Sequence, residues 1–321
     1  MKPIRFFIFL ATIAIPLVFG CQGEFVGEAP RRPPSPWKIM NHPFEKGYYY
    51  GIKFLSETDG WVVGHEGTIL RYDGKAWHKM ESPTKEYLYT LCFLSPADGW
   101  AGGDNGTILH WDGKEWKPVY NPAMEFVSEI RKEKEYICDI DFVSPDDGWA
   151  VGSAGLILHW NGGKWERVIC PHKELIYRVD FLNKDDGWAV CDRGVIIHWD
   201  GKVWQEVLSP TDRPLAALGF VSPDDGWAMG SIGTILHWDG TRWSQFKSPT
   251  VSYIFDVDFI DSNYGWAVGD LDTFHWDGIE WKVIPSPRKR GFFYAVDFLK
   301  RGWGGAVGTY GAIIQYKGER G

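Results

Sequence analysis

Acidic side chains recur at fixed places in this sequence, just before phenylalanines that end short apolar runs such as "YIFDVDF" (Tyr253 to Phe259). Six aspartates take these places: Asp139, Asp141, Asp180, Asp256, Asp258 and Asp297. Side chains two residues apart on a strand point to the same face, so each run would present its carboxylates on one side. Gathered carboxylates could bind a cation or a basic segment of another protein, and their repulsion would raise some of their pKa values. The alternative is that they bind water and the backbone amides of neighbouring strands.

Two basic residues occupy the same columns and reduce the excess of negative charge. Arg178 stands two residues before Asp180, and Lys53 stands just before Phe54. Calcium would need several oxygen ligands within about 2.3–2.6 Å, closer than aspartates on opposite sides of a ring are expected to approach. We therefore expect a basic protein segment or water at these aspartates, and no metal ion.

Histidines of the recurring "HW" pairs are the other candidates for metal binding, and they are His110, His159, His198, His237 and His275. Each would lie on the third strand of a different copy of the repeat described next. With about 4.8 Å between neighbouring strands, that position lies roughly 10 Å outward from the innermost strand. Five equivalent side chains so placed cannot converge on one ion, and we expect them to be structural.

The segments that hold these residues are copies of one unit. "FVSPDDGWAVGSAGLILHWNGGKW" (Phe142 to Trp165) is nearly repeated as "FVSPDDGWAMGSIGTILHWDGTRW" (Phe220 to Trp243). Copies of one unit usually stack, because no copy can bury its apolar faces alone. The Gly-Trp pair recurs seven times, at Trp61, Trp100, Trp149, Trp188, Trp227, Trp266 and Trp303.

Each copy contains four strand-like segments. An apolar alternating run comes first, a turn built on Pro, Asp and Gly leads to a segment such as "WAVG", and the third segment reads "TILHW". An Asp-Gly turn, a strong hairpin signal, then leads to the fourth segment. Four antiparallel strands in about forty residues are typical of a propeller blade. The predicted fold is all-β, a seven-bladed β-propeller with four-stranded antiparallel blades.

The seventh copy lacks its fourth segment, which predicts how the ring closes. Six copies have a fourth segment that begins with Trp, whereas the last copy ends after "AIIQYKG". The stretch "PWKIM" precedes the first copy, and its Trp37-Lys38 pair matches Trp116-Lys117. We predict that residues 36–40 complete the last blade as its outer strand, which would leave no open sheet edge between the first and last blades.

The units "DGWAVGxxGTILHWDGxxW" resemble those of the photosystem II stability/assembly factor-like propellers, a seven-bladed branch of the BNR, or Asp-box, group. The resemblance covers residues 36–321. It implies a non-enzymatic propeller outside the cytoplasm that binds proteins. The Asp-Gly-x-x-Trp turns, such as Asp112 to Trp116, are shorter than the Asp-box of that group. Members that act on photosystems use a basic surface, whereas this chain carries a formal net charge of −8.

The N-terminal residues are typical of an export signal. Lys2 and Arg5 precede the apolar run "FFIFLATIAIPLVFG", which is short for a transmembrane helix. The stretch "LVFGC" resembles a bacterial lipobox and predicts lipidation of Cys21, which would anchor the protein to a membrane in the cell envelope. Phe19 departs from the small residue usual in a lipobox, so secretion without lipid is the alternative. The predicted organisation is a signal peptide over 1–20, a Pro-rich tether over 21–35, and the propeller over 36–321.

The insertion between the second and third copies, residues 121–136, reads "NPAMEFVSEIRKEKEY". Its apolar residues have near-helical spacing amid charges, and they are Met124, Phe126, Val127 and Ile130. The segment could be a short helix packed on a blade rim or a projection that binds a partner, since additions to a rigid scaffold often carry function.

The sequence offers little support for catalysis. A sialidase-like hydrolase would need several arginines around a substrate carboxylate, beside a tyrosine and an acid, and Arg178 is the single arginine in the first segments. There is no Ser-His-Asp order, phosphate loop or HExxH motif, and nothing suggests a cofactor. Cys92, Cys138, Cys170 and Cys191 match no zinc pattern, and their disulfide state is left open.

The predicted function is therefore a non-enzymatic scaffold that binds a protein partner. The acidic balance argues against a general nucleic-acid binder. A carbohydrate-binding, lectin-like propeller is the alternative. With Trp37 included, all 19 Trp fall in the repeat columns, which leaves none for an aromatic ligand cage.

Overall fold

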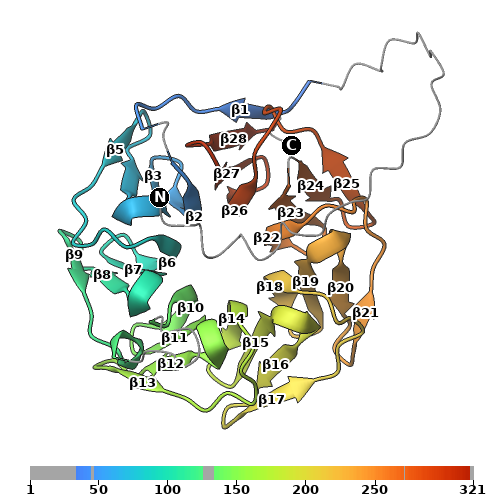
Figure 1. Cartoon of the computed structure of the whole chain (residues 1–321). Coiled ribbons are helices and arrows are strands. Elements are labelled where there is room, and N and C mark those ends of the chain that lie inside the picture. Colours follow the sequence, from blue (N-terminus) through green and yellow to red (C-terminus); the bar gives the residue numbers. More distant parts are fainter. Residues whose placement is uncertain (1–33, 45–46, 126–133, 271, 319–321) are drawn as a thin grey trace, which may run out of the picture. The chain divides into compact units, whose positions relative to one another are not determined.

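The computed structural model of this chain describes residues 34–44, 47–125, 134–270 and 272–318, all within one compact unit that begins at Pro34. This unit consists of seven four-stranded antiparallel sheets arranged around a common axis, with the strand that begins each sequence repeat innermost (Figure 1). The predicted seven-bladed β-propeller is confirmed. Among the residues just named, no helix has the length and apolar character needed to span a bilayer.

Each blade takes four strands, and blades 1 to 6 take them consecutively from the chain. Blade 1 comprises β2 (Tyr49–Ser56), β3 (Asp59–Gly64), β4 (Ile69–Tyr72) and β5 (Trp77–Lys79). Blades 2 and 3 comprise β6 (Leu88–Ser95), β7 (Asp98–Gly103), β8 (Ile108–Trp111), β9 (Trp116–Pro118), β10 (Ile137–Ser144), β11 (Asp147–Gly152), β12 (Ile157–Trp160) and β13 (Trp165–Arg167). Blades 4 and 5 comprise β14 (Ile176–Asn183), β15 (Asp186–Cys191), β16 (Ile196–Trp199), β17 (Trp204–Val207), β18 (Leu215–Ser222), β19 (Asp225–Gly230), β20 (Ile235–Trp238) and β21 (Trp243–Gln245). Blade 6 comprises β22 (Ile254–Asp261), β23 (Tyr264–Gly269), β24 (Thr273–Trp276) and β25 (Trp281–Ile284).

Blade 7 joins the two ends of the propeller. Its inner strands are β26 (Phe293–Lys300), β27 (Trp303–Gly308) and β28 (Ile313–Lys317), and its outer strand is β1 (Trp37–Ile39). β1 pairs antiparallel with β28, with Trp37 opposite Tyr316 and Ile39 opposite Ile314. The predicted closure by the N-terminal strand is therefore confirmed.

The Trp columns form the contacts between blades. Trp149 of blade 3 stacks on Phe181 of blade 4 with ring centroids 5.0 Å apart, and it meets the edge of Trp204 at 5.7 Å. Trp37 occupies the position equivalent to Trp204 at the contact between blades 6 and 7. There its ring meets the ring of Trp266 with centroids 5.2 Å apart and an interplanar angle of 84°. The repeat is thus explained by packing, since each blade supplies one indole to the next blade's aromatic core.

In blades 1 to 6 the second strand begins two residues earlier than the sequence predicted, whereas β27 of blade 7 begins at Trp303 as predicted. Asp147 and Gly148 lie in β11, because Ser144 pairs with Asp147 and only Pro145 and Asp146 form the turn. A register shift near the start of each first strand, between Ile137 and Asp139 in β10, leaves one extra residue there. Such a bulge re-aims side chains, and here it follows the beginning of the innermost strand.

Candidate functional site: an acidic cavity at the ring axis

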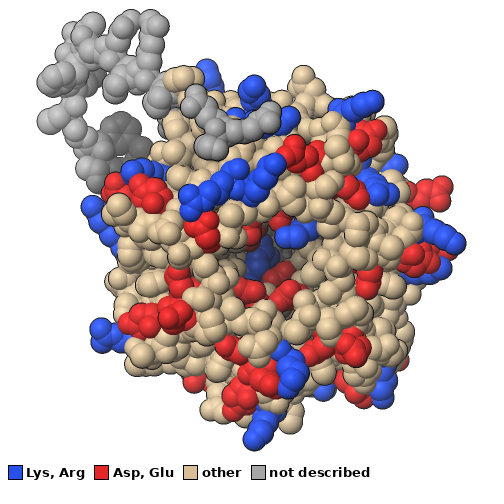
Figure 2. Space-filling view, turned by 180° about the vertical axis from the view of Figure 1, so that it is seen from behind, with Lys and Arg blue, Asp and Glu red and all other residues tan. Residues whose placement is uncertain are grey.

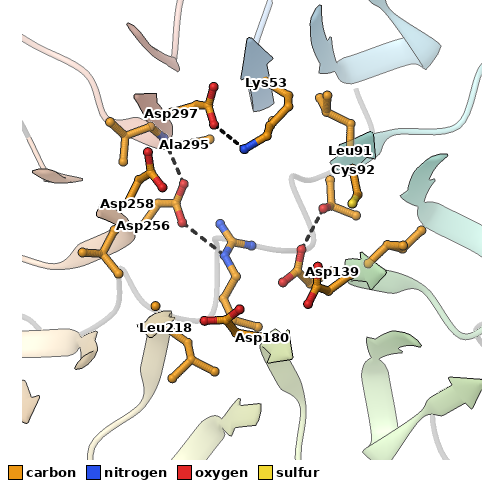
Figure 3. Close-up of a pocket in the computed structure, with 18 of the residues that line it drawn as sticks. Lys53, Leu91, Cys92, Asp139, Asp180, Leu218, Asp256, Asp258, Ala295 and Asp297 are labelled. Atoms are coloured by element: carbon orange, nitrogen blue, oxygen red, sulfur yellow. Dashed lines mark hydrogen bonds and ion pairs between the residues drawn. The ribbon is translucent and has the colours of Figure 1, made fainter. Parts of the chain in front are cut away.

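The innermost strands enclose a cavity of about 280 Å³ at the centre of the ring. The six predicted aspartates and Arg178 all line it, together with Lys53. Figure 3 shows the labelled aspartates directed toward the axis from several blades, and Figure 2 shows acidic and basic atoms within a central hollow. The structure therefore brings together side chains that lie far apart in the sequence.

Each of these aspartates accepts a hydrogen bond from a backbone amide of the next blade. Asp141 Oδ2 accepts from Phe181 N at 2.8 Å, and Asp180 Oδ2 accepts from Phe220 N at 2.8 Å. Asp258 does the same with Phe298 N at 2.6 Å. Asp297 closes the series with Phe54 N of blade 1 at 2.7 Å, and Asp139 and Asp256 bind Val179 N and Val296 N. We call these contacts the aspartate latches. They satisfy amides that would otherwise face the cavity unpaired.

The two basic residues pair with aspartates of other blades. Lys53 Nζ lies 2.6 Å from Asp297 Oδ1, and this carboxylate raises the pKa of Lys53 above its usual value. Arg178 of blade 4 donates from Nε to Asp256 Oδ1 of blade 6 at 3.4 Å (Figure 3). Among the described residues, the other four aspartates of the cavity form no ion pair with Lys53 or Arg178, and they are Asp139, Asp141, Asp180 and Asp258.

Burial strongly raises the pKa values of three of these four aspartates. Desolvation raises the pKa of Asp141 to about 6, although the hydrogen bond from Phe181 N acts in the opposite direction. Desolvation and the neighbouring Asp141 raise the pKa of Asp180 to about 8. Desolvation and Asp297 raise the pKa of Asp258 to about 7. Near neutral pH the cavity thus holds protons that a cationic group could displace.

The histidines of the "HW" pairs each bind within their own blade. His159 Nε2 lies 2.8 Å from Asp147 Oδ1, and its ring stacks on Trp149 with centroids 4.4 Å apart. The same pairing recurs in blades 2, 4 and 5. In blade 6, Tyr264 replaces the aspartate and contacts the ring of His275 at 4.8 Å. Within the described parts of the chain, no group of three or more His, Cys, Asp or Glu side chains could hold a metal ion.

Both described ends of the insertion form polar contacts with the propeller. Asn121 is fully buried, donates from Nδ2 to Gly106 O at 2.8 Å, and accepts from Ala123 N to begin a 3₁₀ turn, η4 (Pro122–Met124). Met124 is half-buried at the end of this turn. At the other end, buried Glu135 pairs with Arg167 of β13. The other predicted residues, Phe126, Val127 and Ile130, lie outside the described residues.

The sequence suggested backbone amides as one possible partner of the aspartates, but two details of the site were not predicted. The latches connect an aspartate of one blade to an amide 40 residues later, a spacing that is one residue longer than the 39-residue repeat visible in the sequence. A layer of aromatic side chains, which includes Tyr50 and Tyr89, also lines the cavity near the start of the first strands. The sequence pattern that indicates this layer is a Tyr or Phe three residues before the aspartate position in most copies of the repeat, as with Tyr294 and Asp297.

Comparisons with known proteins agree on the fold. Residues 71–173, which include blades 2 and 3, match the family model described as photosynthesis system II assembly factor YCF48. A solved structure of YCF48 bound to a D1 peptide is 18% identical, with a TM-score of 0.72, and the match covers 89% of this chain and 98% of that one. YCF48 from Cyanidioschyzon merolae is 18% identical, with a TM-score of 0.68 and coverage of 88% and 98%. The WD40 propeller domain of Doa1 is 11% identical, with a TM-score of 0.71 and coverage of 88% and 95%. No curated protein matches the sequence. The chain is thus a propeller that resembles the photosystem II assembly factors of the BNR type.

Proposed function

We propose that this propeller is a non-catalytic scaffold that holds a segment of a partner protein, outside the cytoplasm and anchored by lipid at Cys21. The observation that carries the proposal is the acidic cavity, in which four of the six aspartates form no ion pair among the described residues (Figure 3). The likeness to YCF48, solved with a bound D1 peptide, supports a protein as the ligand.

The pairing of the cavity residues argues against catalysis. Arg178 binds Asp256, and the aspartates bind amides of the next blade. A hydrolase needs an acid and a nucleophile that are free to reach a substrate, whereas these carboxylates are already engaged in holding the ring together.

A basic segment fits the charge of the cavity. Six aspartates face Lys53 and Arg178, and burial keeps part of the carboxylates protonated. A lysine or arginine side chain that enters the hollow seen in Figure 2 would stabilise the ionised carboxylates and replace several waters, given about 30 Å³ per water.

Removing charge from the cavity should weaken the binding of a basic peptide. In the triple variant Asp141→Asn, Asp180→Asn, Asp258→Asn, each amide oxygen can still accept the latch hydrogen bond, so the fold should persist. We expect a fluorescein-labelled peptide of alternating Lys and Gly to bind the parent protein, and to bind the variant at least about tenfold more weakly, since 1.4 kcal/mol is a tenfold change. Fluorescence anisotropy at low and high salt measures both the affinity and its screening.

The matched control removes three charges from hairpin turns. Asp112, Asp200 and Asp239 accept backbone hydrogen bonds in these turns, and Asn161 already makes the same bonds in blade 3. The variant with asparagine at those three positions should bind the peptide like the parent. An equal loss of peptide affinity in the cavity variant and the hairpin-turn variant would mean that the net charge of the protein, and not the cavity, attracts the peptide.

Lipidation at Cys21, which lies outside the described residues, gives a separate prediction. Mass spectrometry of the mature protein should find an acylated N-terminus at Cys21, and Cys21→Ser should release the protein from the membrane fraction, because acyl chains supply the anchor. An unmodified N-terminus downstream of Cys21 would instead indicate ordinary secretion.

A further inference from the structure

Left-handed residues form a repeated feature at the connection between the second and third strands. Six blades place a non-glycine residue there with φ between 51° and 56°: Glu66, Asn105, Ala154, Arg193, Ile232 and Tyr310. Such a conformation is unfavourable for side chains other than Gly, Asn and Asp, and most of all for a β-branched one. Ile232 and Tyr310 are nevertheless 49% and 52% exposed. A strained backbone conformation that exposes an apolar side chain to solvent suggests that the side chain has a function.

Another apolar side chain is exposed beside Tyr310 at the start of blade 7. Phe292 is 40% exposed, and its N donates to Thr309 Oγ1 at 2.9 Å, beside Tyr310. Phe292 also contacts Phe255 at 6.1 Å, and Phe255 stacks on Tyr253 at 4.6 Å.

A further exposed apolar side chain lies in the loop that follows blade 5. Val251, two residues before Tyr253, is 81% exposed. The adjacent Ser252 O accepts from Gly233 N at 2.7 Å, which ties this loop to the connection that carries Ile232. Exposed apolar residues therefore occur at this end of blades 5 to 7, which are drawn from yellow to red in Figure 1.

A basic loop lies beside Tyr310. The loop into blade 7 contains Arg288, Lys289 and Arg290 and no acidic residue, whereas the equivalent loops into blades 2, 4 and 5 contain Glu86, Glu174 and Asp212. The Arg290 guanidinium lies 5.7 Å from the Tyr310 ring centroid. Asp270, which forms a bridge with Phe292, and Asp272, whose N donates to Asp270 O, are acidic neighbours, but the three basic residues outnumber them.

These residues differ in place and in chemistry from the acidic cavity. They lie where the first strands begin, whereas Asp297 is the fifth residue of β26. Tyrosine, arginine and large apolar side chains are the residue types that dominate the energy of protein interfaces. We define Ile232, Val251, Arg288, Arg290, Phe292 and Tyr310 as the rim patch.

We propose that the rim patch is a second docking surface, which binds a partner segment that carries acidic and apolar side chains. The apolar residues would contact Ile232, Phe292 and Tyr310, and the acidic residues would pair with Arg288 and Arg290. Two surfaces of opposite preference would let one propeller hold two segments at once, which goes beyond the single site of the proposed function.

Glycine substitution separates binding from folding at this patch. Glycine adopts the left-handed backbone without strain, so Ile232→Gly with Tyr310→Gly should leave the melting temperature unchanged or higher. We expect this double variant to bind a labelled peptide of alternating Asp and Leu at least about tenfold more weakly than the parent. Arg288→Gln with Arg290→Gln should weaken binding similarly and reduce its dependence on salt.

The controls use the same position in other blades. Asn105→Gly with Ala154→Gly makes the same backbone change and should not affect binding. Lys85→Gln with Lys173→Gln removes two charges from equivalent loops and should have little effect. The asparagine variant of Asp141, Asp180 and Asp258 should bind the acidic peptide normally, so failure of one surface is distinguishable from failure of the other.

Three outcomes would overturn the proposal. The parent protein could fail to bind the acidic apolar peptide at millimolar concentration, or the control variants could lose as much affinity as the patch variants. In the third, full-length Cys21→Ser protein would bind vesicles that contain phosphatidylglycerol, in a manner that depends on Ile232, Tyr310 and Arg290, while ignoring the peptide. That result would make the patch a membrane contact.

Discussion

Trp37→Ala should lower the free energy of unfolding by about 3–5 kcal/mol, the usual effect of removing a large buried aromatic side chain. Trp37 is only 2% exposed and contacts Trp266, Phe298 and Tyr316. Its Nε1 donates to Thr273 Oγ1 of blade 6 at 2.9 Å. The substitution therefore empties the seam between blades 6 and 7, and urea unfolding followed by tryptophan fluorescence measures the loss.

A neighbouring residue of the same strand provides the control. Ile39 also lies in β1 but is 51% exposed, so Ile39→Ala should change stability much less. Deletion of residues 36–41 should go further, because it uncovers the hydrogen-bonding edge of β28 and invites self-association. A deletion variant that stays monomeric in sedimentation and melts like the parent would contradict closure by β1.

The stability of the propeller should fall as the pH rises from about 4 to about 8. Unfolded aspartates have a pKa near 3.9, whereas burial raises the pKa of Asp141 to about 6, of Asp258 to about 7 and of Asp180 to about 8. In that window the folded state holds protons that the unfolded state has released, so each group contributes a slope of up to about 1.4 kcal/mol per pH unit.

Two asparagine substitutions in the cavity should change the stability of the propeller in opposite directions near neutral pH. Asp180→Asn keeps the acceptor for Phe220 N but cannot ionise, so the variant should match the parent near pH 3 and exceed its stability by a margin that grows from about pH 4 to about pH 8. Asp297→Asn removes the partner of Lys53 and should destabilise at pH 7 by about 1.5 kcal/mol, at the low end for a charged hydrogen bond because Lys53 is 41% exposed. Parallel pH curves for Asp180→Asn and the parent would show that Asp180 is ionised throughout.

The ring could be predicted from the sequence because its determinants repeat. The Gly-Trp pairs gave seven blades, and the unmatched Trp37 gave the closing strand. Strand limits were less accurate. Asp and Gly are residue types that favour turns, but Asp147 and Gly148 pair with Ser144 and Phe142 and so belong to β11.

The roles of the aspartates depended on geometry between blades. Strand alternation placed Asp141 and Asp180 near the axis, but it could not show that each carboxylate binds the amide of a phenylalanine in the next blade. The rim patch was also hidden, since the left-handed backbone at Ile232 and Tyr310 follows from the connection's geometry and not from residue type.

Closure by β1 also imposes an order on biosynthesis. β1 is translated before every other strand of the propeller, and β28, its partner, after all of them. At about 5–20 residues per second, Trp37 must wait tens of seconds for Tyr316 to emerge. A prematurely terminated chain would contain β1 but lack β28, the strand with which β1 pairs. Only a chain that includes β28 can pair and bury β1. An incomplete chain would leave β1 exposed to proteases and chaperones.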